Sequence, residues 1–111
     1  MTLSKQKRKR VYTKFNGHCA YCGTEITYEN MQVDHIVSRS NGGTDDINNL
    51  YPSCGMCNLF KGPLNLKLFR REIKKQTESI CNHYQVRMAL AYGLIQKTNT
   101  DVSFYFEKKK H

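Results

Sequence analysis

The sequence predicts a small α+β domain that a structural zinc ion holds together. Two Cys-x-x-Cys pairs, Cys19/Cys22 and Cys54/Cys57, form knuckles of the kind that bind zinc. A strand-like segment lies between the knuckles, and helical patterns flank them on both sides. The chain has 111 residues, of which 39% are apolar and none is Trp, so its core alone is marginal. Bound zinc would supply the missing stability, because free energy of metal binding becomes free energy of folding.

The cysteines admit a second interpretation, two disulfides in a secreted mini-protein. Residues 1–14, however, are basic and polar rather than an apolar signal-peptide core, and no stretch reaches transmembrane length. A fifth cysteine would also be left without a disulfide partner. His18 could replace one ligand, but four cysteines already complete a zinc shell. We therefore predict one zinc ion on Cys19, Cys22, Cys54 and Cys57, with Cys81 as a buried thiol.

The first half of the chain predicts a helix, a strand and a turn. Residues 4–15 have helical spacing, with Ser4 as the N-cap and Gly17 as the stop signal. Residues 31–37 alternate as a strand does. The glycine-rich segment 40–44 predicts a turn, after which Asp45 and Asp46 are expected to cap a short helical turn that leads to residues 48–50.

The second half predicts a brief extended segment and mainly helices. Pro52 confines residues 51–53 to a sheet edge, and the second knuckle opens a helix over residues 58–61. Two amphipathic helices follow, near residues 66–76 and 79–97, with His83 in a structural role. Residues 102–106 predict a terminal strand whose aromatic side chains, Phe104-Tyr105-Phe106, pack in the core rather than stack on bases. We expect one domain, 1–111, with parts 1–17, 18–62, 63–107 and a tail at 108–111.

The net charge of +9, from 18 Lys+Arg against 9 Asp+Glu, is concentrated in two clusters. Such clusters favour a polyanionic partner, because neutralised phosphates release counterions. The alternative is a solvated surface with a disordered tail. The clusters are Lys5, Lys7, Arg8, Lys9, Arg10 and Lys14, and then Lys61, Lys67, Arg70, Arg71, Lys74 and Lys75.

The residues around the knuckles resemble the HNH endonuclease family. The resemblance covers roughly residues 12–62 and rests on both cysteine pairs, on Val33-Asp34-His35-Ile36, on the stretch SNGGTDDINNL at 40–50, and on Asn58 and Lys61. Members share a ββα-metal (His-Me finger) core in which two strands and a helix hold one catalytic divalent ion. Cysteine-rich members add a structural zinc. The resemblance implies metal-dependent cleavage of nucleic acid.

The resemblance also implies roles for individual residues. His35 would be the general base, since a neutral imidazole can take a proton from water at physiological pH. Asp34 would ligate Mg²⁺ or Mn²⁺ through a carboxylate oxygen. Asn49 would be the middle signature residue, whose amide ties the intervening loop and helps orient His35. Asn48 is the alternative alignment, but the Asn-Leu pairing favours Asn49.

The third signature position departs from the common pattern, because Asn58 stands where many members have His. Its amide oxygen can still ligate a hard cation, and Asn variants form a subgroup of the family. We expect a weaker preference for Ni²⁺ or Zn²⁺, which imidazole suits better. Candidates for contacts with nucleic acid, either at the scissile phosphate or more generally along the backbone, are Arg39, Lys61, Lys67, Arg70 and Arg71.

The sequence therefore predicts a zinc-stabilised DNA endonuclease that uses Mg²⁺ or Mn²⁺, acts on double-stranded DNA and nicks one strand at a time. We expect a monomer or weak dimer in the cytoplasm of a bacterial or phage-infected cell, with a phage or mobile-element origin by analogy. The rival interpretation is a non-catalytic, zinc-dependent nucleic-acid-binding module. A third is a ribonuclease.

Overall fold

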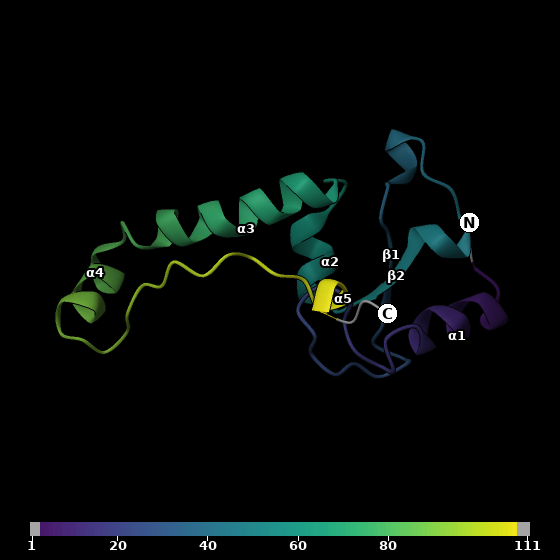
Figure 1. Ribbon diagram of the computed structural model, residues 1–111, viewed down its shortest axis with the longest axis horizontal. Helices are drawn as coiled ribbons and strands as arrows, with labels where there is room; N and C mark the ends of the chain where they lie inside the picture. The colour runs from purple at the N-terminus through teal and green to yellow at the C-terminus, as the bar shows by residue number, and fades with distance from the viewer. Residues whose placement is uncertain (1–2, 109–111) are drawn as a thin grey trace. The chain divides into compact units, whose positions relative to one another are not determined.

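The computed structural model describes residues 3–108, which fall into two compact units. The described part of the larger unit is residues 3–66 with 103–108, and the smaller unit is Lys67–Val102. Both contain helices, and the larger one holds the sheet, so the predicted α+β class is confirmed. Elements of the larger unit are α1 (Lys5–Thr13), β1 (Gln32–His35), η1 (Arg39–Asn41), η2 (Ile47–Asn49), β2 (Leu50–Ser53), α2 (Gly55–Lys61) and α5 (Tyr105–Lys108) (Figure 1).

The sheet consists of two short antiparallel strands, β1 and β2. Asp34 pairs with Tyr51 and His35 with Leu50, while Pro52 lies opposite Val33. Both strands of a two-stranded sheet are edges, so the missing N–H of proline is tolerated there. The strand expected at 31–37 is shorter than predicted, because regular pairing ends at His35.

Helix α1 begins as predicted, since the Ser4 hydroxyl accepts a hydrogen bond from Lys7 N at 3.1 Å. It ends at Thr13, two residues before the predicted end. The left-handed backbone of Asn16 (φ 54°) and Gly17 (φ 81°) then turns the chain away from the helix.

Three cations of α1 and its C-cap bind backbone carbonyls of the chain itself. Arg8 donates to the carbonyls of Tyr28 and Met31, both at 2.9 Å. Lys14 Nζ donates to the carbonyl of Leu50 at 2.7 Å, and Lys7 Nζ reaches Asp45 O at 2.6 Å. Assigning this whole cluster to a polyanionic partner was therefore wrong for these three residues, because their charged ends hold α1 to the fold.

The core of the larger unit is aromatic on one side. Phe104 is 2% exposed, and its ring meets that of Tyr21 at a centroid distance of 5.4 Å. This aromatic cluster therefore packs in the core, as predicted, rather than presenting its rings for stacking on bases. The predicted terminal strand is wrong, because Tyr105 N and Phe106 N bond to the carbonyls of Tyr21 and Ala20 and α5 begins at Tyr105. Lys108 ends α5, and the rest of the predicted tail, 109–111, lies outside the described residues.

The smaller unit contains α3 (Leu66–Ile80, which starts one residue before the unit) and α4 (Tyr84–Ala91). The long helix predicted at 79–97 is wrong, because a turn at residues 81–83 separates α3 from α4 and Gly93 adopts a left-handed backbone (φ 72°) after α4. His83 is the N-cap residue of α4, and Cys81 is half-buried rather than buried. Among residues 3–108, no helix has the length and apolar character needed to cross a bilayer.

The tether from Arg8 generates a testable prediction. Arg8→Met keeps an unbranched helix-forming stem but leaves the carbonyls of Tyr28 and Met31 without their charged donor. We expect the free energy of unfolding to fall by about 1.5–3 kcal/mol, measured by urea denaturation of zinc-loaded protein. The control is Arg10→Met, an exposed position on the same helix, where the change should stay within about 0.5 kcal/mol. Equal shifts for the two variants would contradict the tether.

Candidate functional site

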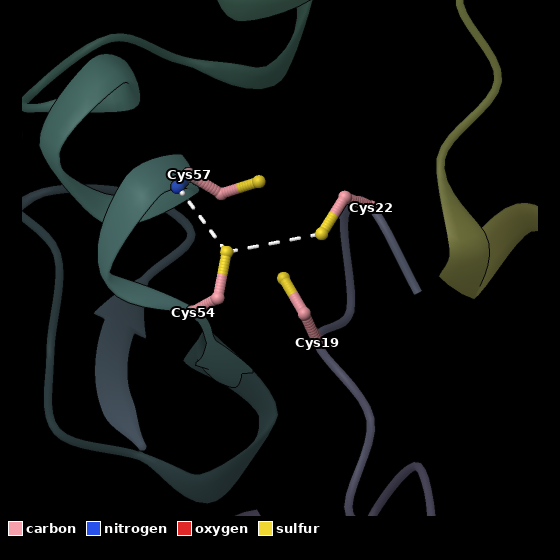
Figure 2. Close-up of side chains that lie close together, drawn as sticks. All are labelled: Cys19, Cys22, Cys54 and Cys57. Atoms are coloured by element: carbon pink, nitrogen blue, oxygen red, sulfur yellow. Dashed lines mark hydrogen bonds between the residues drawn. The ribbon is translucent and has the colours of Figure 1, made fainter. Parts of the chain in front are cut away.

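The four knuckle cysteines converge on one point, with their Sγ atoms all within 4.8 Å of one another (Figure 2). Cys22 Sγ and Cys54 Sγ lie 3.8 Å apart. Four thiolates at about 2.3 Å from a tetrahedral zinc are separated by about 3.8 Å along each edge. The soft donor set and its spacing therefore fit a closed structural zinc site, as predicted from Cys19, Cys22, Cys54 and Cys57.

Local backbone geometry positions each half of this cluster. In the first knuckle, Gly23 N donates to Cys19 O at 3.0 Å, and Gly23 holds the left-handed conformation (φ 80°) that the tight turn requires. In the second, Cys54 is the N-cap of α2 and its sulfur accepts a hydrogen bond from Cys57 N at 3.4 Å. The ligands thus come from a turn and from a helix start, which the metal would join.

The protonation of the thiols is interdependent. A hydrogen bond from Cys57 lowers the pKa of Cys19 to about 4, and the same bond raises the pKa of Cys57. Burial raises the pKa of Cys22. One thiolate therefore forms easily, while each further negative charge is opposed unless a cation compensates it.

The alternatives to this ligand set are not realised. All five cysteines are free thiols, so the two-disulfide interpretation does not apply. The ring of His18 stacks on Tyr105 at a centroid distance of 5.5 Å, and its Nδ1 lies 3.1 Å from Phe15 O. His18 is accordingly a packing residue.

A second group of side chains lines an open hollow of about 330 Å³ between β1 and α2. Strand β1 contributes Asp34 and His35, and α2 contributes Asn58, the residue directly after Cys57. Arg39 lines the same hollow. The residues predicted as metal ligands and general base therefore come together, although they are far apart in the chain.

Asp34 is buried, with 4% exposure, and two side chains hold its Oδ2 atom. The Tyr21 hydroxyl donates a hydrogen bond to it, and Lys61 Nζ lies 3.3 Å away. Burial raises the pKa of the Asp34 carboxyl, while Tyr21 and Lys61 act in the opposite direction. Both contacts are at Oδ2, and Asp34 also lines the hollow.

Lys61 is not a surface contact for nucleic acid, which corrects the prediction. Its side chain is 0% exposed, and Nζ also donates to His35 O at 3.2 Å. A buried ammonium group requires an anionic partner, and Asp34 provides it. Lys61 therefore holds Asp34 and the His35 backbone inside the site.

His35 is held by a chain of polar contacts that sequence reasoning missed. Its Nε2 lies 2.7 Å from Asp45 Oδ1, and Arg39 donates to the same carboxylate from Nε at 3.1 Å and from Nη2 at 2.8 Å. Hydrogen bonds from His35 and Arg39 lower the pKa of Asp45. With Nε2 donating to this carboxylate, Nδ1 is the nitrogen left to accept a proton. Asp45 was predicted only as a cap, a role that Asp46 alone plays for η2.

Asn49 closes the loop that follows β1. Its amide nitrogen donates to Val37 O at 3.0 Å and Thr44 O at 2.8 Å, while its oxygen accepts from Val37 N at 2.9 Å. Asn48, the alternative alignment, is exposed. Inside the closed loop, Gly43 lies so close to the Val37 backbone that a Cβ atom would fall 1.7 Å from Val37 O. The remaining predicted contacts, Lys67, Arg70 and Arg71, lie on α3 in the smaller unit.

The thiol cluster predicts a specific response to ligand removal. We expect one zinc per chain, lost in Cys57→Ser together with the cooperative unfolding transition, because the free energy of structural zinc binding is about 10–16 kcal/mol and is coupled to folding. Elemental analysis and thermal unfolding followed by circular dichroism measure both. The matched control, Cys81→Ser, alters the fifth cysteine and should retain one zinc. A Cys57→Ser protein with full zinc content and an unchanged transition would rule out the cluster as the binding site.

Known proteins share sequence and fold with part of this chain. Residues 19–63 match the model of the family described as HNH endonuclease. A stretch of 48 residues, 42% of this chain, is 48% identical to the CRISPR-associated endonuclease Cas9 of Corynebacterium diphtheriae. The crystal structure of the Type II-C Cas9 enzyme from Actinomyces naeslundii superposes on 66% of the chain with a TM-score of 0.57 and 28% identity. The chain spans only 4% and 9% of the lengths of these two proteins. The segment that carries the four cysteines and the Asp34–His35–Asn58 hollow is therefore the part of the chain that matches the HNH endonuclease family.

Proposed function

We propose that this protein is a metal-dependent endonuclease that hydrolyses phosphodiester bonds in DNA and cuts one strand per encounter. The observation that carries the proposal is the gathering of Asp34, His35 and Asn58 around one hollow. A module that only binds nucleic acid has no need of a polarised imidazole beside two oxygen ligands. A single such hollow faces one scissile bond at a time, so each encounter cuts one strand. The chain acts as a monomer or weak dimer in this proposal.

The donor chemistry of the hollow fits a hard cation. Asp34 offers a carboxylate oxygen and Asn58 an amide oxygen, which are the ligand types that Mg²⁺ and Mn²⁺ prefer. When bound there, the cation would offset negative charge that develops on the phosphate oxygens. Tyr21 and Lys61 hold Asp34 in place from the opposite side of its carboxylate. This catalytic ion is distinct from the zinc that the four thiols fit.

His35 is the group that moves a proton. Its Nδ1 accepts a proton from the attacking water, and the imidazolium that results is stabilised by Asp45 at Nε2. Arg39 holds Asp45 through two donors and so fixes the orientation of the ring. General-base assistance of this kind contributes about 10²–10⁴-fold to rate.

Thiolates that must stay reduced to bind zinc suit a cytoplasmic setting, in a bacterial or phage-infected cell.

Plasmid nicking tests the proposal. Zinc-loaded protein with Mg²⁺ or Mn²⁺ should convert supercoiled plasmid to the open-circular form, measured on agarose gels, and His35→Ala should lower that rate at least about 100-fold. His83→Ala is the matched control, an exposed histidine in the smaller unit, and should leave the rate unchanged. No nicking by wild-type protein with either metal, or equal nicking by His35→Ala, would favour the non-catalytic binding module. Cleavage confined to single-stranded RNA, offered in parallel, would favour a ribonuclease.

Metal preference tests the role of Asn58. Asn58→His replaces a hard amide oxygen with an imidazole nitrogen, which binds softer ions better. We expect the nicking rate with Ni²⁺ to rise relative to that with Mg²⁺, measured on the same plasmid at fixed protein concentration. An unchanged ratio of the two rates would remove Asn58 from the ligand set. Asn48→His, an exposed asparagine in the loop, is the control and should not alter the ratio.

A further inference from the structure

The sequence of helix α3, which is labelled in Figure 1, places a row of cations on one face of the helix. Their spacing of three, one, three and one residues places all of them within one side of an α-helix, over a length of about 12 Å. The apolar residues Leu66, Phe69 and Ile73 fall on the opposite side. We name this row the α3 cationic face; it consists of Lys67, Arg70, Arg71, Lys74 and Lys75.

The charges of the α3 cationic face are directed to solvent. Four of its five residues are exposed, and Arg70 is half-buried with its guanidinium donating to Val102 O at 2.6 Å. Lys74 lies 3.5 Å from Asp101, a carboxylate that is itself 96% exposed. Among residues 3–108, Lys67, Arg71 and Lys75 form no ion pair. Arg8 and Lys14 of the larger unit bind backbone carbonyls, whereas these three cations make no such contact with the described residues.

The same residues line an open cavity of about 740 Å³. The five cations share its wall with Glu78 and Asp101, so positive charge predominates. A cationic row beside an open cavity suits an extended chain of linked anions. Each strand of duplex DNA carries one phosphate per about 3.4 Å of duplex axis, and its phosphates lie further apart than this along their helical path. A row of about 12 Å that bears long side chains can therefore reach about three of them.

We propose that the α3 cationic face binds the phosphate backbone of one strand of duplex DNA, without reading its sequence. The inference rests on the proposed function for the choice of polyanion, and it assigns the smaller unit a task in substrate binding. Lys presents a compact point charge and Arg a planar fork of donors, and both suit phosphate oxygens.

An anionic membrane surface is the other polyanion that a basic helix can meet. A helix that lies in a membrane interface must insert its apolar side into the lipid. In α3 that side is committed to the protein, because Phe69 is only 1% exposed and Ile73 is half-buried. Duplex DNA requires only the cationic side, and the structure favours it for that reason.

The test measures how binding depends on salt. A labelled 20-base-pair duplex is titrated with zinc-loaded protein between 50 and 200 mM KCl without added Mg²⁺ or Mn²⁺, and His35→Ala serves as the background to suppress cleavage further. The variant combines Lys67→Gln, Arg71→Gln and Lys75→Gln, which retain helix propensity. The slope of log Kobs against log[salt] should become shallower by about 2.7, since each phosphate contact contributes about 0.9.

Two controls make the result specific. Lys5→Gln, Lys9→Gln and Arg10→Gln together remove the same charge from exposed positions of α1 and should change the slope by less than about 1. Lys67→Arg, Arg71→Lys and Lys75→Arg together preserve the charge and should preserve the slope, which separates lost contacts from lost folding. An unchanged slope in the Gln variant, or equal changes in the α1 and α3 variants, would overturn the proposal.

Two further outcomes separate this inference from its alternatives. Loss of binding to phosphatidylserine vesicles in the α3 variant, with duplex binding intact, would overturn it in favour of a membrane surface. If the wild-type protein fails to nick plasmid but its duplex binding depends on the α3 cationic face, the proposed nuclease activity fails and the binding surface stands. If nicking proceeds while the α3 substitutions leave duplex binding unchanged, the nuclease stands and the binding surface fails.

Discussion

The convergence of four thiols is the constraint on which the rest of the larger unit depends. A sheet of two four-residue strands has little stability of its own in water. The thiol cluster joins the knuckle at Cys19 to the first turn of α2, which follows directly from β2. Because Asn58 comes immediately after Cys57, the same turn that presents a thiol also presents an amide to the hollow. A metal that takes no part in hydrolysis would therefore set the geometry of the residues proposed to perform it.

Around the hollow of the larger unit, charge is organised in closed sets of paired side chains. Asp34 is matched by Lys61 and Tyr21, and Asp45 by Arg39 and His35. These pairings orient two side chains of the hollow while offsetting the negative charge that would repel a phosphate. In the smaller unit the opposite holds for three cations of α3, since Lys67, Arg71 and Lys75 form no ion pair with any described residue. The basic composition of the chain thus divides into a part that holds the fold together and a part that is free to meet a partner.

Local signals in the sequence predicted what local chemistry determines. The Ser4 cap and the zinc knuckles depend on residues only a few positions apart, and both predictions agree with the structure. The position of Tyr21 beside Asp34 and the burial of Lys61 depend on packing between distant segments, which no local pattern encodes. The aromatic residues at 104–106 have high strand propensity, but hydrogen bonds to the first knuckle and ring packing against Tyr21 override it.

The loop closed by Asn49 limits how the chain length can vary around the hollow. Asn49 spans the loop from Val37 to Thr44, and Gly43 leaves no space for a side chain against the Val37 backbone. These contacts therefore fix the distance between the two ends of the loop. Residues near Asn41 are exposed and lie outside these contacts. Related chains that differ in loop length should carry their insertions at that tip. Insertions between Gly43 and Asn49 would instead move Asp45 out of reach of His35.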